Sequence, residues 1–166
     1  MRPNRTDITA AICAVVFIVV LAVSAYWDRS IRVLHVFESL PYLLAAVLCL
    51  RRNKIGYALG LVSGAFWIWT AGFLTTFIRN GFERLAMLLR TGSVDRPDIF
   101  IAVPAAVAAT GLALWSVLGY ARLTNKSWRD SAVLGAVVVM IPAFFIAIFA
   151  ALAPQYLQMF RGLVNR

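Results

Sequence analysis

The distribution of charged residues limits the fold of this chain more than any other feature. Five windows contain no Asp, Glu, Lys or Arg, at residues 8–27, 39–50, 55–78, 99–121 and 131–160. Four of them reach the roughly 20 apolar residues that a helix needs to cross a hydrocarbon core of about 30 Å. Backbone groups in lipid must bond to one another, so such runs form helices or closed barrels. The short alternating segments of a barrel do not occur in this sequence.

The sequence therefore predicts an all-α fold, a polytopic transmembrane helix bundle without a β-sheet and with one membrane domain over residues 1–166. Hydrophobic residues make up 62% of the chain and charged residues 14%, against about half and a quarter in soluble domains. The apolar spacing of residues 80–90 predicts a short interfacial helix, and residues 155–166 are expected to form a short surface helix. The five spans are expected at about 8–27, 32–50, 55–78, 99–120 and 131–153.

Two of these spans have an alternative interpretation. Residues 39–50 would extend only about 18 Å as a helix, so a full crossing must begin near Arg32. Otherwise the chain has four spans and a half-inserted segment. The first span ends in Val23, Ser24 and Ala25, which would suit a signal-peptide cleavage site. We favour an uncleaved anchor, because the apolar run is longer than a usual signal core.

The positive charge of the chain indicates a lipid surface rather than a nucleic acid. The formal net charge is +9, but the basic residues flank the spans, where they meet anionic head groups. In the five-span arrangement, each face of the membrane receives eight Lys or Arg residues. On the membrane face that holds the N-terminus, these basic residues lie in short connections that contain few Asp or Glu residues. We therefore expect a bacterial cytoplasmic (inner) membrane, with the N-terminus in the cytoplasm.

The inventory of reactive side chains excludes several kinds of site. His35 is the single histidine, so bis-histidine haem ligation within one chain is excluded. A zinc or di-iron site needs three or four ligands that can meet, and the spans hold only His35, Glu38, Cys13 and Cys49. Both lysines lie in predicted loops, which excludes a Schiff base within a span. We expect no metal and no cofactor.

A polar stripe on the second span is the first candidate site. Arg32, His35, Ser39 and Tyr42 share one helix face, and Glu38 lies at its edge. Ionisable groups in lipid are costly, so they usually face the interior of the bundle and carry function. Histidine also changes its charge near neutral pH. The stripe predicts a ligand or proton path. Alternatively, these groups lie at head-group depth, with Glu38 paired to a neighbour.

Small residues on the third and fourth spans predict close helix packing. Glycines recur every four residues on the third span, and alanines do so on the fourth. Such stripes let two backbones approach closely, within one chain or between copies. Trp67 lies beside the glycines and serves either as packing or as the wall of a ligand pocket. The residues expected to pack are Gly56, Gly60, Gly64, Ala105, Ala109 and Ala113.

Three functions remain open. We favour a small membrane binding or accessory component that packs through its small-residue faces, with the lipid bilayer and a second copy or a larger membrane complex as partners. The alternative is a small transporter or channel with a proton or anion path along Arg32, His35 and Glu38. An enzyme acting on lipid, with His35 and Glu38 as acid and base, ranks last because no nucleophile accompanies them in the sequence.

Overall fold

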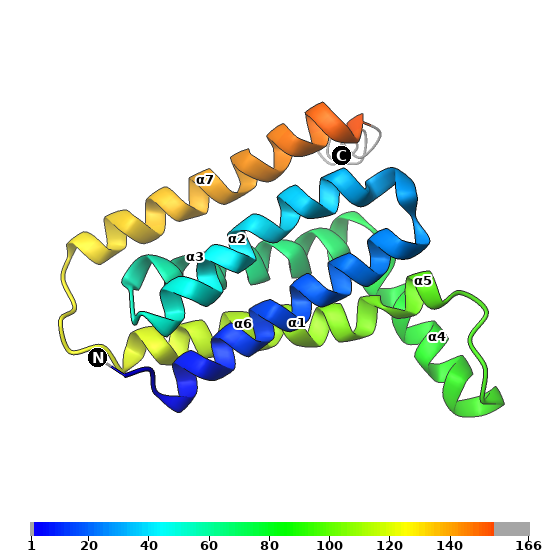
Figure 1. Ribbon diagram of the computed structural model, residues 1–166, viewed down its shortest axis with the longest axis horizontal. Coiled ribbons are helices and arrows are strands. Elements are labelled where there is room, and N and C mark those ends of the chain that lie inside the picture. The colour runs from blue at the N-terminus through cyan, green and yellow to red at the C-terminus, as the bar shows by residue number, and fades with distance from the viewer. Residues whose placement is uncertain (1, 155–166) are drawn as a thin grey trace.

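The computed structural model describes residues 2–154, and this part of the chain is helical without strands, as the sequence predicts. The surface helix expected at 155–166 lies outside the described residues. Figure 1 shows the arrangement of the helices. Their bounds are α1 Arg5–Trp27, η1 Arg29–Ile31, α2 Arg32–Leu50, α3 Lys54–Trp69, η2 Thr70–Leu74, α4 Phe77–Thr91, α5 Pro97–Phe100, α6 Ala102–Ala121 and α7 Arg129–Leu152.

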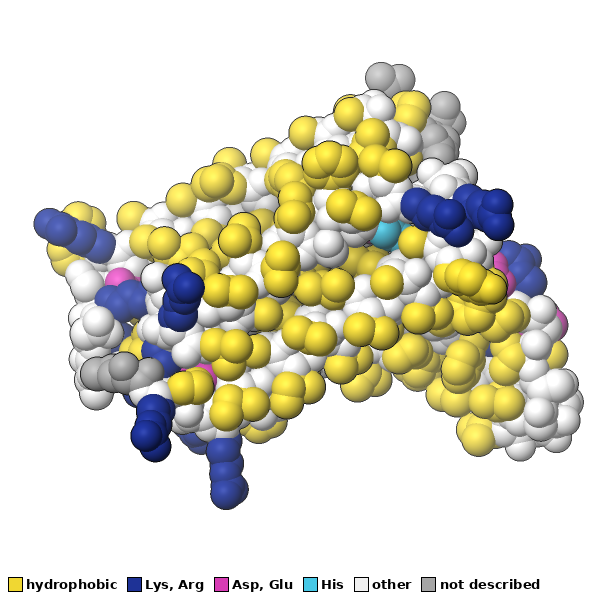
Figure 2. Space-filling view, in the orientation of Figure 1, with side chains coloured by type: hydrophobic (Ala, Val, Ile, Leu, Met, Phe, Trp, Pro, Cys, Tyr) yellow, Lys and Arg dark blue, Asp and Glu magenta, His cyan; other side chains and the backbone are white. Residues whose placement is uncertain are grey.

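Within residues 2–154, five helical segments are long and apolar enough to cross a membrane. Apolar side chains cover most of the face seen in Figure 2, while Lys and Arg side chains gather toward the two ends. The second segment is continuous from η1 through α2, and Pro41 lies inside α2 without ending it. The five segments are Arg5–Trp27, Arg29–Leu50, Lys54–Leu74, Pro97–Ala121 and Arg129–Leu152.

The third segment differs from the single helix expected over 55–78. The α-helix ends at Trp69 and continues as a π-helical turn, η2, in which the Thr75 amide donates to the Thr70 carbonyl at 3.0 Å. Thr75 is extended, and its hydroxyl donates to the Ala71 carbonyl and accepts from the Phe77 amide. Threonine hydroxyls compete for backbone groups in this way. This competition explains why the helical segment ends at Leu74, directly before Thr75.

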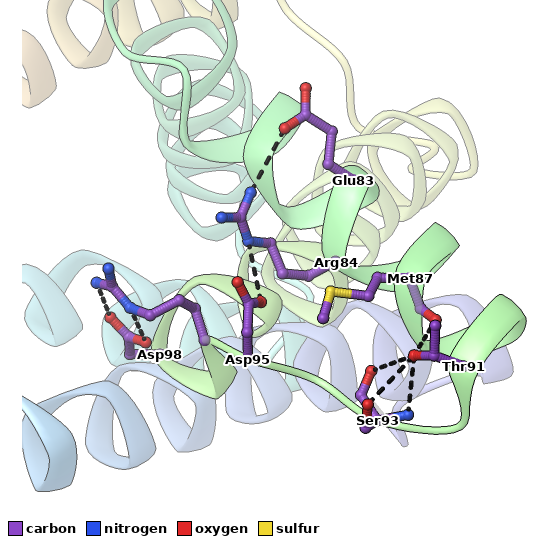
Figure 3. Close-up of polar contacts among 8 residues, drawn as sticks. Glu83, Arg84, Met87, Thr91, Ser93, Asp95 and Asp98 are labelled. Carbon is purple, nitrogen blue, oxygen red and sulfur yellow. Dashed lines mark hydrogen bonds and ion pairs between the residues drawn. The ribbon is translucent and has the colours of Figure 1, made fainter.

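The helix α4 leaves the bundle at an angle (Figure 1). It begins at Phe77, three residues before the interfacial helix expected at 80–90, and ends at Gly92, whose φ of 71° is left-handed. Glycine adopts this conformation without steric cost. The loop that follows returns beside α4, where the Arg84 Nε lies 3.5 Å from a carboxylate oxygen of Asp95 (Figure 3). The chain then enters α5.

The small-residue stripes meet inside the chain. A Cβ added to Gly64 would lie 2.6 Å from the carbonyl oxygen of Ala109 on α6, with Ala113 beside it. Gly60 faces Leu112 and Ser116 of the same helix, whereas Gly56 faces Leu48 and Cys49 of α2. The helices α1, α2, α3 and α6 therefore form the centre of the bundle, and α7 packs against α3 and, less extensively, α2.

Candidate ligand-binding cavity

A cavity of about 440 Å³ lies in one half of the bundle, at the end where α1 finishes and α2 begins. This volume is in the range of small-molecule sites. The exposed residues Asp28 and Thr76 lie at its rim. Its lining comes from the last turns of α1, the first turns of α2, the end of α3, η2, the start of α4, the α5–α6 junction and α7.

The inner wall of the cavity is apolar and aromatic. Trp67 lines it and makes an edge-to-face contact with Phe17, with ring centroids 5.2 Å apart. Phe66 and Phe145 line it from α3 and α7, and their ring centroids are 5.3 Å apart. Trp67 therefore packs against the core and also forms part of the cavity wall, so both roles that the sequence leaves open for it remain.

The remaining lining is polar and carries more acidic than basic groups. Three carboxylates belong to it, from Asp28, Glu38 and Asp98, whereas none of the described lining residues is Lys or Arg. The neutral polar side chains come from α1, η2, the residues after η2 and α4. They are Ser24, Thr70, Thr75, Thr76 and Asn80.

Two of the rim carboxylates are held by local contacts. Arg96 donates to Asp98 from Nε at 3.0 Å and from Nη2 at 2.7 Å, and Figure 3 shows this pair beside the loop after α4. Asp28 accepts from the Ser30 amide at 2.9 Å and from the Ser30 hydroxyl at 2.6 Å. These hydrogen bonds from Ser30 lower the pKa of the Asp28 carboxyl below its ordinary value.

His35 is the centre of a chain of three polar side chains in the cavity wall. Its Nδ1 lies 2.5 Å from a carboxylate oxygen of Glu38, one helical turn later on α2. Its Nε2 lies 3.1 Å from the hydroxyl oxygen of Ser24 on α1. The side chains of His35 and Glu38 are only 13% and 12% exposed. The imidazole is therefore bridged on both sides and held in one orientation.

The remaining residues of the predicted polar stripe do not join this group. Arg32 donates from Nε to the Ala25 carbonyl at 2.8 Å, and it lines a second hollow on α1 and α2 together with His35 and Ser39. Ser39 donates to the Val36 carbonyl of its own helix at 2.7 Å. Tyr42 is fully buried and donates to the Ser63 carbonyl at 3.2 Å.

An aromatic layer lies beyond the cavity, and its residues are not part of the cavity lining. Phe17 and Tyr42 are stacked with ring centroids 4.2 Å apart, and both are almost wholly buried. They lie one helical turn beyond the lining residues Leu21 and Glu38, on the side away from the rim. The polar wall therefore does not continue along α2 into the other half of the bundle.

Sequence reasoning missed Ser24, which it treated only as part of a cleavage-like motif. Ser24 comes eleven residues before His35, and the two meet because Asp28 and η1 reverse the chain between α1 and α2. The Asp28–Ser30 spacing is a capping signal that could have placed this reversal. No sequence pattern indicates the π-helical turn η2, which carries Thr70 and Ala71 into the cavity wall.

Within residues 2–154, no group of three or more His, Cys, Asp or Glu side chains is arranged to hold a metal ion. Comparisons with protein-family models, with curated proteins and with solved structures gave no match to this chain. Functional inference therefore depends on the cavity itself.

Proposed function

We propose that this chain is an integral membrane protein that binds an amphiphilic small molecule in the cavity beside His35. The single observation that carries this proposal is the two-sided lining of that cavity. Its inner wall is aromatic, and its polar lining includes three carboxylates with no Lys or Arg among the described lining residues. Pockets of this kind bury an apolar body and orient a polar group.

The charge of the lining favours a ligand with a cationic or neutral polar group. Carboxylates in a partly enclosed wall attract a cation and repel an anion more strongly than they would in bulk water. Aromatic side chains such as Trp67 also accept a cation over their faces. An anionic ligand would meet only His35 as a basic lining side chain.

Binding is better supported than conduction. A proton or anion path along Arg32, His35 and Glu38 would have to continue through the bundle. The stacked pair of Phe17 and Tyr42 lies beyond Glu38 instead. The small-residue stripes fit the same proposal, since Gly60 and Gly64 are used to join α3 to α6 and so to build the walls of the cavity.

For the placement in the cell, we propose the bacterial cytoplasmic membrane, with the N-terminus on the cytoplasmic side. The short connections 51–53 and 122–128 share the end of the bundle that holds the start of α1, and they carry four Lys or Arg residues against no acid. Short loops rich in basic residues remain in the cytoplasm. The cavity would then open on the opposite side, with its hydrophobic wall within the bilayer.

Equilibrium binding of two ions of the same shape and opposite charge tests the ligand class. We expect the protein in detergent to bind the cation tetraphenylphosphonium saturably. It should bind the anion tetraphenylborate at least about tenfold more weakly, because the carboxylates attract the cation and repel the anion. Ala71→Leu, in the cavity wall, should weaken the binding of the cation. Ala143→Leu, exposed on α7, is the matched control.

Two results would reject this proposal. One is equal binding of the cation and the anion. The other is cation binding that Ala71→Leu and Ala143→Leu change to the same extent, since the bound ion would then lie outside the cavity.

A further inference from the structure

We propose that Ser24, His35 and Glu38 form a nucleophilic site that hydrolyses a carboxylic ester of the amphiphile bound in this cavity. The inference rests on the proposed function for the position of the substrate, and adds a reaction to it. The observation behind it is a chain of two contacts, 3.1 Å from Ser24 Oγ to His35 Nε2 and 2.5 Å from His35 Nδ1 to Glu38.

For a neutral imidazole beside an ionised carboxylate, hydrogen-bonding capacity gives the chain one direction. An ionised carboxylate only accepts, so the nitrogen beside Glu38 must carry a proton. In the neutral imidazole, Nε2 then has a lone pair and accepts from the Ser24 hydroxyl. A serine that donates to an imidazole held by a carboxylate is the arrangement that activates a hydroxyl as a nucleophile.

The three residues are held in place by different parts of the chain. Ser24 lies in the last turn of α1, where its carbonyl also accepts from the Asp28 amide at 3.0 Å. His35 and Glu38 are one turn apart on α2, so the helix itself sets their spacing. Residues on regular helices are positioned more accurately than residues on loops. All three side chains line the same cavity.

The cavity provides the remaining parts that an ester would need. Its apolar wall, with Leu21, Trp67 and Phe145, accommodates an acyl chain next to Ser24. Asn80 lines the same cavity, and its amide nitrogen donates one of its two hydrogens to Thr76 at 3.0 Å. In this scheme the second hydrogen is donated to the carbonyl oxygen that becomes negatively charged. The exposed rim at Asp28 admits water, which is the second reactant.

The reaction proceeds in two balanced steps. Ser24 Oγ bonds to the carbonyl carbon while its proton passes to His35 Nε2. The C–O bond to the leaving alcohol then breaks, and the alcohol takes that proton. In the second step a water molecule attacks the acyl-Ser24 ester and gives its proton to His35. The fatty acid leaves, and Ser24 recovers its proton. The net change is ester plus water to acid plus alcohol.

A fluorophosphonate with a long alkyl chain tests the nucleophile directly. In this reagent the Ser Oγ–P bond forms as the P–F bond breaks, so reaction adds a known mass to one peptide. We expect the full-length protein in detergent to be labelled at Ser24. His35→Gln should slow labelling by at least about 100-fold, the range attributed to a general base. Ser131→Ala, which changes an exposed serine on α7, should label at the wild-type rate.

Glu38 is a positioning residue in this scheme, and its test uses ester hydrolysis. Glu38→Gln should lower kcat for p-nitrophenyl octanoate at least about tenfold with KM little changed, because orientation of His35 matters for the chemical step. Glu38→Asp should restore part of kcat. If Glu38→Gln changed KM and kcat by the same factor and Glu38→Asp restored neither, the positioning role would be wrong.

The outcomes separate this inference from the proposed function. If wild-type protein bound tetraphenylphosphonium saturably but Ser24 stayed unlabelled, the hydrolytic site would be rejected and the binding cavity would stand. If Ser24 were labelled in a His35-dependent manner but no cation bound, the hydrolytic site would stand and the ligand class would be rejected. An unfolding temperature of Ser24→Ala close to that of the wild type would show that loss of labelling is not loss of folding.

Discussion

The hydroxyl of Tyr57 donates a 2.7 Å hydrogen bond to the carboxylate of Asp7, so the start of α3 is tied to the start of α1. Asp7 is fully buried, and its other oxygen accepts from the Asn4 amide at 2.9 Å and lies 3.6 Å from Arg52 Nε. This carboxylate therefore joins three segments at the end of the bundle opposite the cavity.

Replacing Tyr57 by Phe should destabilise the protein by about 1–3 kcal/mol, because it leaves a buried carboxylate oxygen without its donor. The measurement is thermal unfolding in detergent followed by circular dichroism. Tyr26→Phe makes the same chemical change at a side chain that is 75% exposed, and it should have almost no effect. Equal unfolding temperatures for the two variants would contradict the prediction.

The contact between α3 and α6 should tolerate no side chain at Gly64. An added Cβ would lie 2.6 Å from the Ala109 carbonyl oxygen, and a backbone atom cannot move away without shifting α6. Gly64→Ala should therefore cost about 1–3 kcal/mol, the range for overpacking. Gly135→Ala is the control, since no atom of the described chain lies within 4 Å of a Cβ added there. This control should be neutral or slightly stabilising, because Ala favours a helix. Similar losses of stability in both variants would rule out the close contact.

The connection between α1 and α2 should weaken in acid. The Ser30 hydrogen bonds lower the pKa of Asp28 in the folded protein. The stabilisation from this group is therefore complete above the ordinary carboxyl pKa of about 3.9 and is lost as the pH falls through the lowered value. Ser30→Ala should raise the Asp28 pKa toward the ordinary value and lower the unfolding temperature at pH 6.

The unfolding temperatures of the wild type and of Ser30→Ala should be equal at a pH below the Asp28 pKa of both proteins, because Asp28 is then protonated in each. Unfolding temperatures measured between pH 6 and pH 2 check this. A difference that stayed constant across the range would show that Ser30 stabilises the connection by some route other than the charge of Asp28.

Five membrane crossings would place the loop after α4 and the loop before α7 on opposite sides. In a chain carrying Cys13→Ala and Cys49→Ala, we expect an impermeant maleimide to label Ser93→Cys from outside intact cells. Asn125→Cys should react only after the cells are opened. Labelling of both positions from one side would contradict the five-crossing arrangement. The reverse pattern would keep the five crossings and invert the proposed orientation.

The coarse architecture could be predicted from the sequence because it follows from local rules. Charge-free runs of more than about 20 residues have few structural solutions, and the helical bounds observed for α1 and α7 are close to those expected. The end of the third helical segment at Leu74 could not be predicted, because it depends on how the Thr75 hydroxyl competes for backbone groups within an otherwise apolar run.

Only part of the candidate site could be predicted from the sequence. His35 and Glu38 lie one helical turn apart, so their meeting follows from helix geometry. Ser24 lies on another helix, and its contact with His35 depends on the tight reversal at Asp28. Asp7 stands just before the first apolar run with no sign of burial in the sequence, yet it is fully buried. Burial of that kind depends on three segments packing together, which no local pattern reveals.

The aromatic layer formed by Phe17 and Tyr42 makes the bundle unequal in its two halves. In a bilayer, the cavity would be accessible to molecules of one leaflet and separated from those of the other. Because the two leaflets of biological membranes differ in composition, the direction of insertion would select the pool of amphiphiles that reaches His35. A chain inserted the other way round would have the same walls and the same polar groups, but a different supply of ligands.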